Sequence, residues 1–266
     1  MKFIKAIFFT ILFFSQLCFS QVKIDSSKIV KVLTFNIFHG ATTKGNFNLD
    51  LIAKVIKDAN PDLVALQEVD FKTKRAKNYD LATEFGWRTK MASLFAKAMN
   101  FDGGEYGDAI LSKSSFIKSF KQPLPYIENH EPRVALSVTT TLASGDTIVF
   151  ISTHLDQFKD ETVRLTQAKK IKEVFSNKIY PTILAGDFND TPTSNTLKIL
   201  GKIWATSYNK ENISPTYPSD RPTEKIDYIM FYPKNKWKVL NTKVIQNKIA
   251  SDHLAYLVTL VLLDNK

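Results

Sequence analysis

Pro181-Thr-Ile-Leu-Ala-Gly-Asp-Phe-Asn-Asp190 begins as a buried β-strand and ends in polar residues. Its short apolar run, 182–185, is typical of a strand in the interior of a sheet. Directly after it come an acid and an amide, Asp187 and Asn189, where the chain leaves the sheet. One such ending is explained by a turn, because Asp and Asn side chains bond to nearby backbone. The stretch therefore indicates a site only if other strands end in the same way.

Other predicted strands also end or begin in polar residues. Three further apolar segments lead into a polar residue, namely Asn36, Glu68 and His154. Two more carry polar residues at their start, namely Asp227 and the pair Asp252-His253. In an antiparallel pair of strands, the start of one lies beside the end of the other. All of these side chains can therefore meet at one edge of the sheets.

Apolar, β-branched segments recur along the chain, with helical segments between some of them. We expect strands at 29–37, 63–66, 109–111, 134–142, 147–153, 182–185, 226–231 and 254–263. We expect helices at 49–59, 79–85, 162–176 and 194–200, with Asn48 placed to cap the first. Ser144-Gly145-Asp146 joins two of the strands as a hairpin. Because some strands pair directly and others are separated by helices, we predict an α/β four-layer sandwich of two packed mixed β-sheets flanked by helices.

Residues 1–20, MKFIKAIFFTILFFSQLCFS, have the features of a secretory signal peptide. Lys2 and Lys5 precede an apolar run, and small residues at positions 18 and 20 offer a cleavage site before Gln21. The alternative is an uncleaved anchor, but the apolar run is shorter than the roughly 20 residues that a spanning helix needs. We expect export to a periplasmic or extracellular location. Residues 21–266 contain no internal repeat or long linker, which predicts a single domain.

The formal net charge is +10 and the pI is about 9.4. Cleavage after residue 20 would remove two lysines, giving +8, and would also remove Cys18, the only cysteine. A positive charge favours polyanionic partners, but it also serves ordinary solubility. The lysines are spread along the sequence, with small basic groups at 72–77 and 234–238. The charge therefore does not define a binding tract, and no segment indicates an obligate protein partner.

Acids and amides without cysteine suit oxygen-preferring cations, above all Mg²⁺ or Mn²⁺. Histidines beside such a cation can bind a phosphoryl oxygen or transfer protons near neutral pH. Together these groups fit the metal-assisted hydrolysis of a phosphate ester by water. The sequence contains no HExxH zinc-protease motif, no GxSxG elbow and no GxxxxGK[ST] phosphate-binding loop, which argues against those three classes of enzyme.

Eight short motifs occur in an order and spacing that resemble the endonuclease/exonuclease/phosphatase superfamily. They are LTFNI at 33–37, ALQEVD at 65–70, EYGDAILS at 105–112, EPR at 131–133, STHLD at 152–156, LAGDFND at 184–190, KIDYI at 225–229 and SDH at 251–253. The superfamily includes deoxyribonucleases, abasic-site endonucleases, neutral sphingomyelinases and inositol polyphosphate 5-phosphatases. The resemblance runs from about Val30 to the C-terminus and implies a two-sheet α/β sandwich.

The resemblance also implies roles for the polar residues at the strand ends. Three residues match groups on the metal side. Glu68 matches the principal Mg²⁺ ligand, Asn36 matches a ligand or a residue that positions that ligand, and Asp252 matches an additional acid. Among the catalytic residues, Asp187 matches the acid that handles the attacking water or the leaving group, and Asn189 matches an amide that holds the phosphoryl group. His253 matches the histidine at the scissile phosphate, oriented by Asp227. His154 matches a second histidine that faces the phosphate.

Tyr106 and Arg133 match residues that contact the substrate. Residues 102–107 and 36–40 together are similar to a branch of exported or membrane-associated members. His39 and Glu105 are either substrate-side groups, as in that branch, or ordinary surface and turn residues.

The candidate substrates are nucleic acid and the head group of a phospholipid such as sphingomyelin or an inositol lipid. An inositol-phosphate phosphatase is an alternative, since Pro215-Thr-Tyr217 resembles those enzymes, but Tyr228 stands where they usually have arginine after the acid. A catalytically inactive binding module for polyanions is a second alternative, although no expected catalytic residue is missing. Four aromatic residues either make a peripheral membrane contact or pack in the core: Phe101, Trp204, Tyr232 and Trp237.

We predict that the mature protein begins at Gln21, because signal peptidase cleaves after small residues. N-terminal sequencing of protein purified after export checks this. Finding Met1 retained would identify residues 1–20 as an anchor instead.

Overall fold

The computed structural model describes residues 24–176 and 179–264. The expected signal peptide, residues 1–20, lies outside these ranges. No helix within them is both long and apolar enough to cross a membrane.

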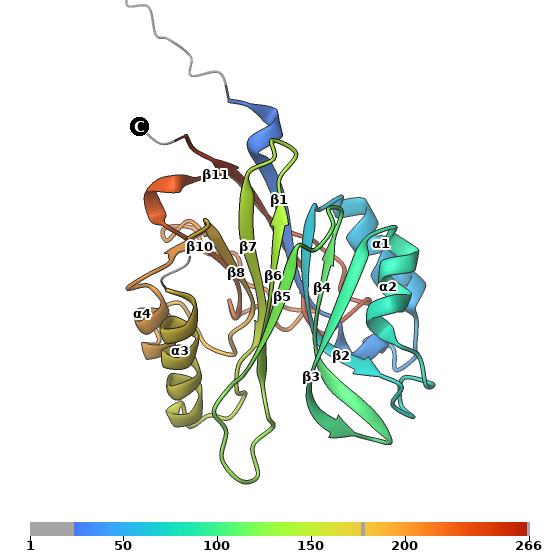
Figure 1. Ribbon diagram of the computed structural model, residues 1–266. Coiled ribbons are helices and arrows are strands. Elements are labelled where there is room, and N and C mark those ends of the chain that lie inside the picture. The colour runs from blue at the N-terminus through green and yellow to red at the C-terminus, as the bar shows by residue number, and fades with distance from the viewer. Residues whose placement is uncertain (1–23, 177–178, 265–266) are drawn as a thin grey trace, which may run out of the picture.

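Twelve strands of the described chain form two six-stranded mixed sheets (Figure 1). The first sheet has the order β11 (Trp237–Val244), β12 (Tyr256–Leu262), β1 (Ile29–Asn36), β2 (Leu63–Phe71), β4 (Gly104–Ser112) and β3 (Ala92–Phe101). The second has the order β5 (Lys118–Pro123), β6 (Val134–Thr141), β7 (Thr147–His154), β8 (Thr182–Asp187), β10 (Asp227–Tyr232) and β9 (Ala205–Thr206). Only β1–β2 and β7–β8 are parallel among these pairs.

The two sheets pack face to face, and helices cover the outer faces (Figure 1). The first sheet carries α1 (Leu49–Ala59) and α2 (Leu81–Thr89), and the second carries α3 (Thr162–Phe175) and α4 (Asn195–Leu200). Val32 packs between the sheets, whereas its neighbour Leu33 packs under the helices. Central strands are thus buried on both faces, which explains their continuous apolar sequences. The predicted four-layer sandwich of two mixed sheets with flanking helices is confirmed.

Several local predictions also hold. α1 has the predicted bounds, and the Asn48 side chain accepts a hydrogen bond of 3.0 Å from the Leu51 backbone N–H. β6 and β7 pair as an antiparallel hairpin around residues 144–146. Two helices end at a residue in the αL conformation: Asn60, a residue that often occupies this position, and Lys90, which does so less commonly. The second helix was predicted at 79–85 and instead spans 81–89.

The strands that the sequence failed to predict are the four at the sheet edges, β3, β5, β9 and β11. Edge strands face solvent on at least one side and often carry polar residues, so they lack the apolar run of a central strand. β5, with the sequence KSFKQP, is exposed along almost its whole length. The central strands were therefore predictable and the edges were not.

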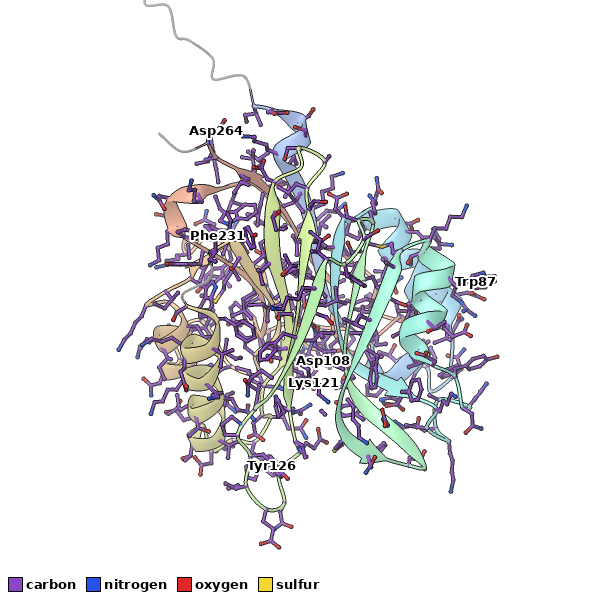
Figure 2. All side chains as sticks on the ribbon, viewed as in Figure 1. Trp87, Asp108, Lys121, Tyr126, Phe231 and Asp264 are labelled. Carbon is purple, nitrogen blue, oxygen red and sulfur yellow. The ribbon has the colours of Figure 1, made fainter. Side chains whose placement is uncertain are left out.

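Two of the four aromatic residues that were expected either to contact a membrane or to pack in the core belong to the core. Trp204 and Trp237 are 1% and 4% exposed, which decides for core packing at these two positions. Tyr232 is half-buried, and Phe101 is exposed at the end of β3. The most exposed tryptophan, Trp87, lies on α2 at the outer surface of the molecule (Figure 2).

Gly186, next to the end of β8, lies against the parallel neighbour β7. A Cβ atom at this position would overlap the backbone carbonyl of Thr153, so only glycine allows the two strands to approach. This close approach brings Asp187 beside His154 in the register of the two strands.

We expect Gly186→Ala to lower the free energy of unfolding by about 3 kcal/mol, because the added methyl group meets backbone that cannot move aside. Gly145→Ala is the matched control: its φ is +88°, but a Cβ there meets nothing within 4 Å, so it should cost only about 1 kcal/mol. Urea unfolding of both variants measures the difference. Equal losses would contradict the packing role of Gly186.

Candidate active site

Glu68 lies at an irregularity in β2. The register between β2 and β4 shifts between Leu66 and Val69, and Glu68 has a left-handed φ of 57°. A bulge of this kind turns a side chain away from the regular alternation of the strand. The Glu68 carboxylate is 21% exposed and lies 3.5 Å from the Nδ1 of His39. The bulge therefore presents a carboxylate at the end of the inter-sheet core.

Asn36, the last residue of β1, joins the two sheets. Its Nδ2 donates to Glu68 Oε1 at 3.0 Å and to Asp187 Oδ2 at 3.2 Å. Its Oδ1 accepts from the Phe38 backbone N–H at 3.1 Å. The reverse orientation of the amide would set its oxygen against two carboxylates. Asn36 thus positions Glu68 and Asp187 with its amino group, and its oxygen faces the backbone.

Asp187 ends β8, and Asp227 begins the antiparallel neighbour β10 directly opposite it in the register. His253 lies between them: its Nδ1 is 3.1 Å from Asp227 Oδ2, and its Nε2 is 3.6 Å from Asp187 Oδ2. All three side chains are buried. Burial acts to lower the pKa of His253, but the charges of Asp227 and Asp187 outweigh it and raise the pKa to about 10. The imidazole therefore carries a positive charge at neutral pH.

His154, the last residue of β7, differs in charge from His253. Arg133 Nη1 donates to its Nδ1 at 3.0 Å, and the Asn189 side-chain amide lies 2.9 Å from its Nε2. Burial and the charge of Arg133 hold the pKa of His154 well below its ordinary value. The ring is neutral, and its Nδ1 accepts from Arg133. Its Nε2 lies 3.5 Å from Asp187 Oδ2.

Arg133 extends this network to Tyr106 on β4. Its Nη1 lies 3.3 Å from the Tyr106 hydroxyl oxygen, to which it donates. Both side chains are buried, at 3% and 5% exposure. Of the two residues predicted to contact substrate, Arg133 therefore contacts His154 directly, and Tyr106 is connected to His154 through Arg133.

The carboxylates of the site differ strongly in proton affinity. Burial acts to raise the pKa of Glu68, but the neighbouring His39, the hydrogen bond from Asn36 and the charge of His253 bring it down to about 2. Burial raises the pKa of Asp187 to about 7. Burial, with a further contribution from the charge of Glu68, also raises the pKa of Asp252. Glu68 is the acid that stays charged at any physiological pH.

The predicted residue Asp252, and His39 and Glu105, whose roles the sequence left open, are less closely tied to the network. The Asp252 Oδ1 atom lies 3.2 Å from the Ser251 hydroxyl oxygen, and in the described chain its side chain makes no hydrogen bond or ion pair with the other predicted site residues. His39 adjoins Glu68. Glu105 pairs with Lys97 at 3.0 Å on the β3–β4 hairpin and is an ordinary surface ion pair.

Some residues of the site were not predicted from the sequence. Asp108 on β4 is buried between the sheets (Figure 2), and burial raises its pKa to about 8. It lies two residues after Tyr106, so both face the same side of the strand, a signal that could have identified it. Ser251 accepts from the His253 backbone N–H at 3.1 Å and donates to the Asn36 carbonyl at 2.7 Å. The Tyr217 ring packs against His253, with ring centroids 4.8 Å apart.

Two groups of side chains could hold a divalent cation. Asp187, Asp227 and His253 bring one potential ligand atom each within 4.8 Å of one another. A cation bound there would have to displace the proton that the two carboxylates hold on the His253 imidazole. The second group is Glu68, which is charged and partly exposed, with Asp252, whose pKa is raised by burial and by the charge of Glu68. A hard cation such as Mg²⁺ or Mn²⁺ would relieve the repulsion between these two carboxylates. Their oxygen atoms therefore fit such a cation better than the group of Asp187, Asp227 and His253 does.

Comparison with known proteins finds a matching family model. A model of the endonuclease/exonuclease/phosphatase family matches residues 33–253. No curated protein sequence matches the chain.

Solved structures share the fold. An endonuclease/exonuclease/phosphatase from Beutenbergia cavernae aligns with a TM-score of 0.75 and 21% identity, over 88% of this chain and 72% of that one. A mannosyl-6-phosphatase from Bacteroides thetaiotaomicron gives 0.71 and 18%, over 88% and 100%. The human Nocturnin catalytic domain, solved with bound sulfate, gives 0.68 and 20%, over 89% and 94%. At these identities the likeness shows the fold alone.

We expect Asp108→Asn to flatten the dependence of stability on pH. The folded protein holds the Asp108 proton up to about pH 8, whereas the unfolded chain releases it near its ordinary pKa of 3.8. Stability therefore falls as pH rises through this window, by about 1.4 kcal/mol per pH unit from this one group.

Urea unfolding at pH 5 and pH 7 measures the effect, and the variant should lose less stability over this interval than the wild type. Other groups contribute to the slope that remains: Asp187 and Asp252, whose pKa values are also raised, in the same direction, and His154, whose pKa is lowered, in the opposite direction. Asp58→Asn on α1, where the side chain is 61% exposed, is the control. An equal loss of stability between pH 5 and pH 7 in the wild type and in Asp108→Asn would show that Asp108 is ionised in the folded state.

Proposed function

Because this chain belongs to the endonuclease/exonuclease/phosphatase family, as its motifs predicted, we propose that it is an exported, divalent-metal-dependent phosphodiesterase. Members of the family are phosphoesterase hydrolases. Metal dependence, the diester substrate and export are the parts of the proposal that go beyond family membership.

The observation that carries the proposal is the convergence of donors on Asp187. This buried carboxylate accepts from Asn36 of the other sheet and from the Asn189 backbone N–H at 2.9 Å, and two histidines lie within 3.6 Å of it. Its pKa of about 7 suits a group that takes up and releases a proton near neutral pH. We assign to Asp187 the deprotonation of the attacking water.

The other side chains are placed to hold the phosphoryl group. His253 is protonated, and Asp227 fixes the ring through Nδ1, so Nε2–H is the donor that faces the site. Neutral His154 and the Asn189 amide supply further polar contacts without adding charge. Pairs of titratable groups whose pKa values are driven apart are typical of acid–base sites. This arrangement suits a reaction in which negative charge develops on phosphoryl oxygens.

Glu68 would hold the cation, with Asn36 as positioner and Asp252 as an additional acid. When bound, Mg²⁺ or Mn²⁺ supplies electrostatic stabilisation of the phosphoryl oxygens and a lower pKa for water. The low pKa of Glu68 means that the protein does not need to lose a proton there before the ion binds.

The proposal includes two candidate substrate classes, nucleic acid and a phospholipid head group. Residues 24–266 or the mature protein, supplied with Mg²⁺, would be tested on DNA, sphingomyelin, phosphatidylinositol, mannose 6-phosphate and bis(p-nitrophenyl) phosphate. Hydrolysis of a diester that is lost in His253→Ala supports the proposal and identifies the class. Hydrolysis of mannose 6-phosphate alone would replace it with a monoesterase. No hydrolysis of any substrate would favour the binding-only alternative.

We expect excess EDTA to abolish hydrolysis of bis(p-nitrophenyl) phosphate and added Mg²⁺ or Mn²⁺ to restore it, while dithiothreitol has no effect. Glu68→Gln should lower turnover by about 10²–10³, as removal of a group that stabilises the transition state usually does. It should also weaken Mg²⁺ binding measured by calorimetry. Lys54→Met, an exposed change on α1, is the control. Activity that persists in EDTA would contradict the metal assignment.

A further inference from the structure

Arg75 lies in the loop between β2 and α2, within the basic group 72–77, and has no role in the site as described so far. Its Nε donates to Asp70 Oδ2 at 2.7 Å and its Nη2 donates to Asp70 Oδ1 at 2.9 Å. Asp70 is completely buried, and Thr73 Oγ1 also donates to it at 2.6 Å. This two-pronged pairing fixes the plane of the guanidinium group.

Two aromatic rings and the neighbouring hairpin hold Arg75 further. Its Cζ lies 4.3 Å from the centroid of the Phe101 ring and 5.5 Å from that of Tyr106. The Asp102 side chain, in the turn between β3 and β4, accepts from the Arg75 backbone N–H at 2.7 Å. Both the backbone and the side chain of Arg75 are therefore fixed before any ligand arrives.

Arg75 also lies close to the candidate active site, near enough for the charge of Glu68 to act on it. Asp70 stands opposite Tyr106 in the register of β2 and β4, two residues beyond Glu68. The Tyr106 hydroxyl accepts from Arg133, which in turn donates to His154. A short chain of contacts thus connects Arg75 to the histidine that faces the proposed phosphoryl position.

Neutralisation of Asp70 does not use the whole guanidinium group. Nε and Nη2 satisfy the carboxylate, and within residues 24–176 and 179–264 Nη1 makes no hydrogen bond. The Arg75 side chain is 31% exposed. An arginine held over an aromatic ring with one N–H edge unpaired is well suited to bind a phosphate, since little side-chain entropy remains to be lost.

We propose that Arg75 binds a second phosphate of the substrate, next to the one that is hydrolysed, and so selects substrates that carry two phosphates over those that carry one. The inference rests on the proposed function, because it places the scissile phosphate at Asp187 and His253. A neighbouring phosphate of a nucleotide and a second phosphate on an inositol head group offer the same chemistry to Arg75.

Binding rather than turnover provides the test, so it remains informative if the protein has no activity on the substrates above. Calorimetry would compare thymidine 5′-phosphate with thymidine 3′,5′-bisphosphate, and inositol 1-phosphate with inositol 1,4-bisphosphate, in the presence of Mg²⁺. The wild type should bind the bisphosphate of at least one pair about 10- to 100-fold more tightly, the range of a charge-assisted hydrogen bond. The pair that shows the preference identifies the source of the second phosphate.

Arg75→Met should reduce that preference to about one, whereas Lys54→Met, which removes the same charge from α1, should leave it unchanged. Because Arg75→Met also leaves a buried Asp70 without its partner, Asp70→Asn and the double variant Asp70→Asn/Arg75→Met separate the two roles. The preference for the bisphosphate should persist in Asp70→Asn and disappear in the double variant. Arg75→Lys, which keeps the positive charge, should retain part of the preference that Arg75→Met loses.

Two results would overturn the proposal. One is a wild type that prefers the bisphosphate in neither pair. The other is an equal preference for the bisphosphate in Asp70→Asn and in the double variant, which would show that Arg75 only neutralises Asp70. Failure of the proposed function is distinguishable, because it would show as absent hydrolysis of the whole substrate panel while the binding preference remains measurable.

Discussion

The candidate active site depends on one buried carboxylate. Asp187 is 1% exposed at the end of a central strand, where an ionised acid is costly unless hydrogen bonds and charges compensate it. Its partners come from far apart in the chain: Asn36 ends β1, His154 ends β7, and His253 precedes β12. These groups meet only when both sheets are packed against each other. Satisfying Asp187 therefore requires the complete sandwich.

Two similar β–α–β units, one in each sheet, place these residues at the site. In each sheet a parallel pair of strands is connected by a helix on the outer face, β1–α1–β2 in the first and β7–α3–β8 in the second. Parallel strands end at the same edge of a sheet, so the first unit supplies Asn36 and Glu68 and the second supplies His154 and Asp187. Antiparallel neighbours then add residues at their beginnings, as Asp227 does opposite Asp187. The inter-sheet core holds the two edges together.

Burial and local charge give chemically similar side chains of the site different protonation states. Glu68 stays ionised while Asp187 has a pKa of about 7, and His253 is protonated while His154 is neutral. Asp187 adjoins both histidines. Burial and the charge of Arg133 keep His154 neutral, whereas the added carboxylate of Asp227 keeps His253 protonated. One small site can thus offer a charged ligand for a cation, a proton acceptor and a cationic donor at the same pH.

The sequence by itself determined the central strands, the first helix with its Asn48 cap, the β6–β7 hairpin and the polar residues at the strand ends. Each of these is encoded locally, by an apolar run, a capping residue or a turn. Tertiary structure decided which strands form the edges, that Trp204 and Trp237 are buried, and that Asn36 presents its amino group to both carboxylates. It also decided that Asp108 faces the site and that Asp70 stands opposite Tyr106, which sets Arg75 beside it. These features depend on register and packing between segments distant in the chain, and no local pattern of residues encodes that register.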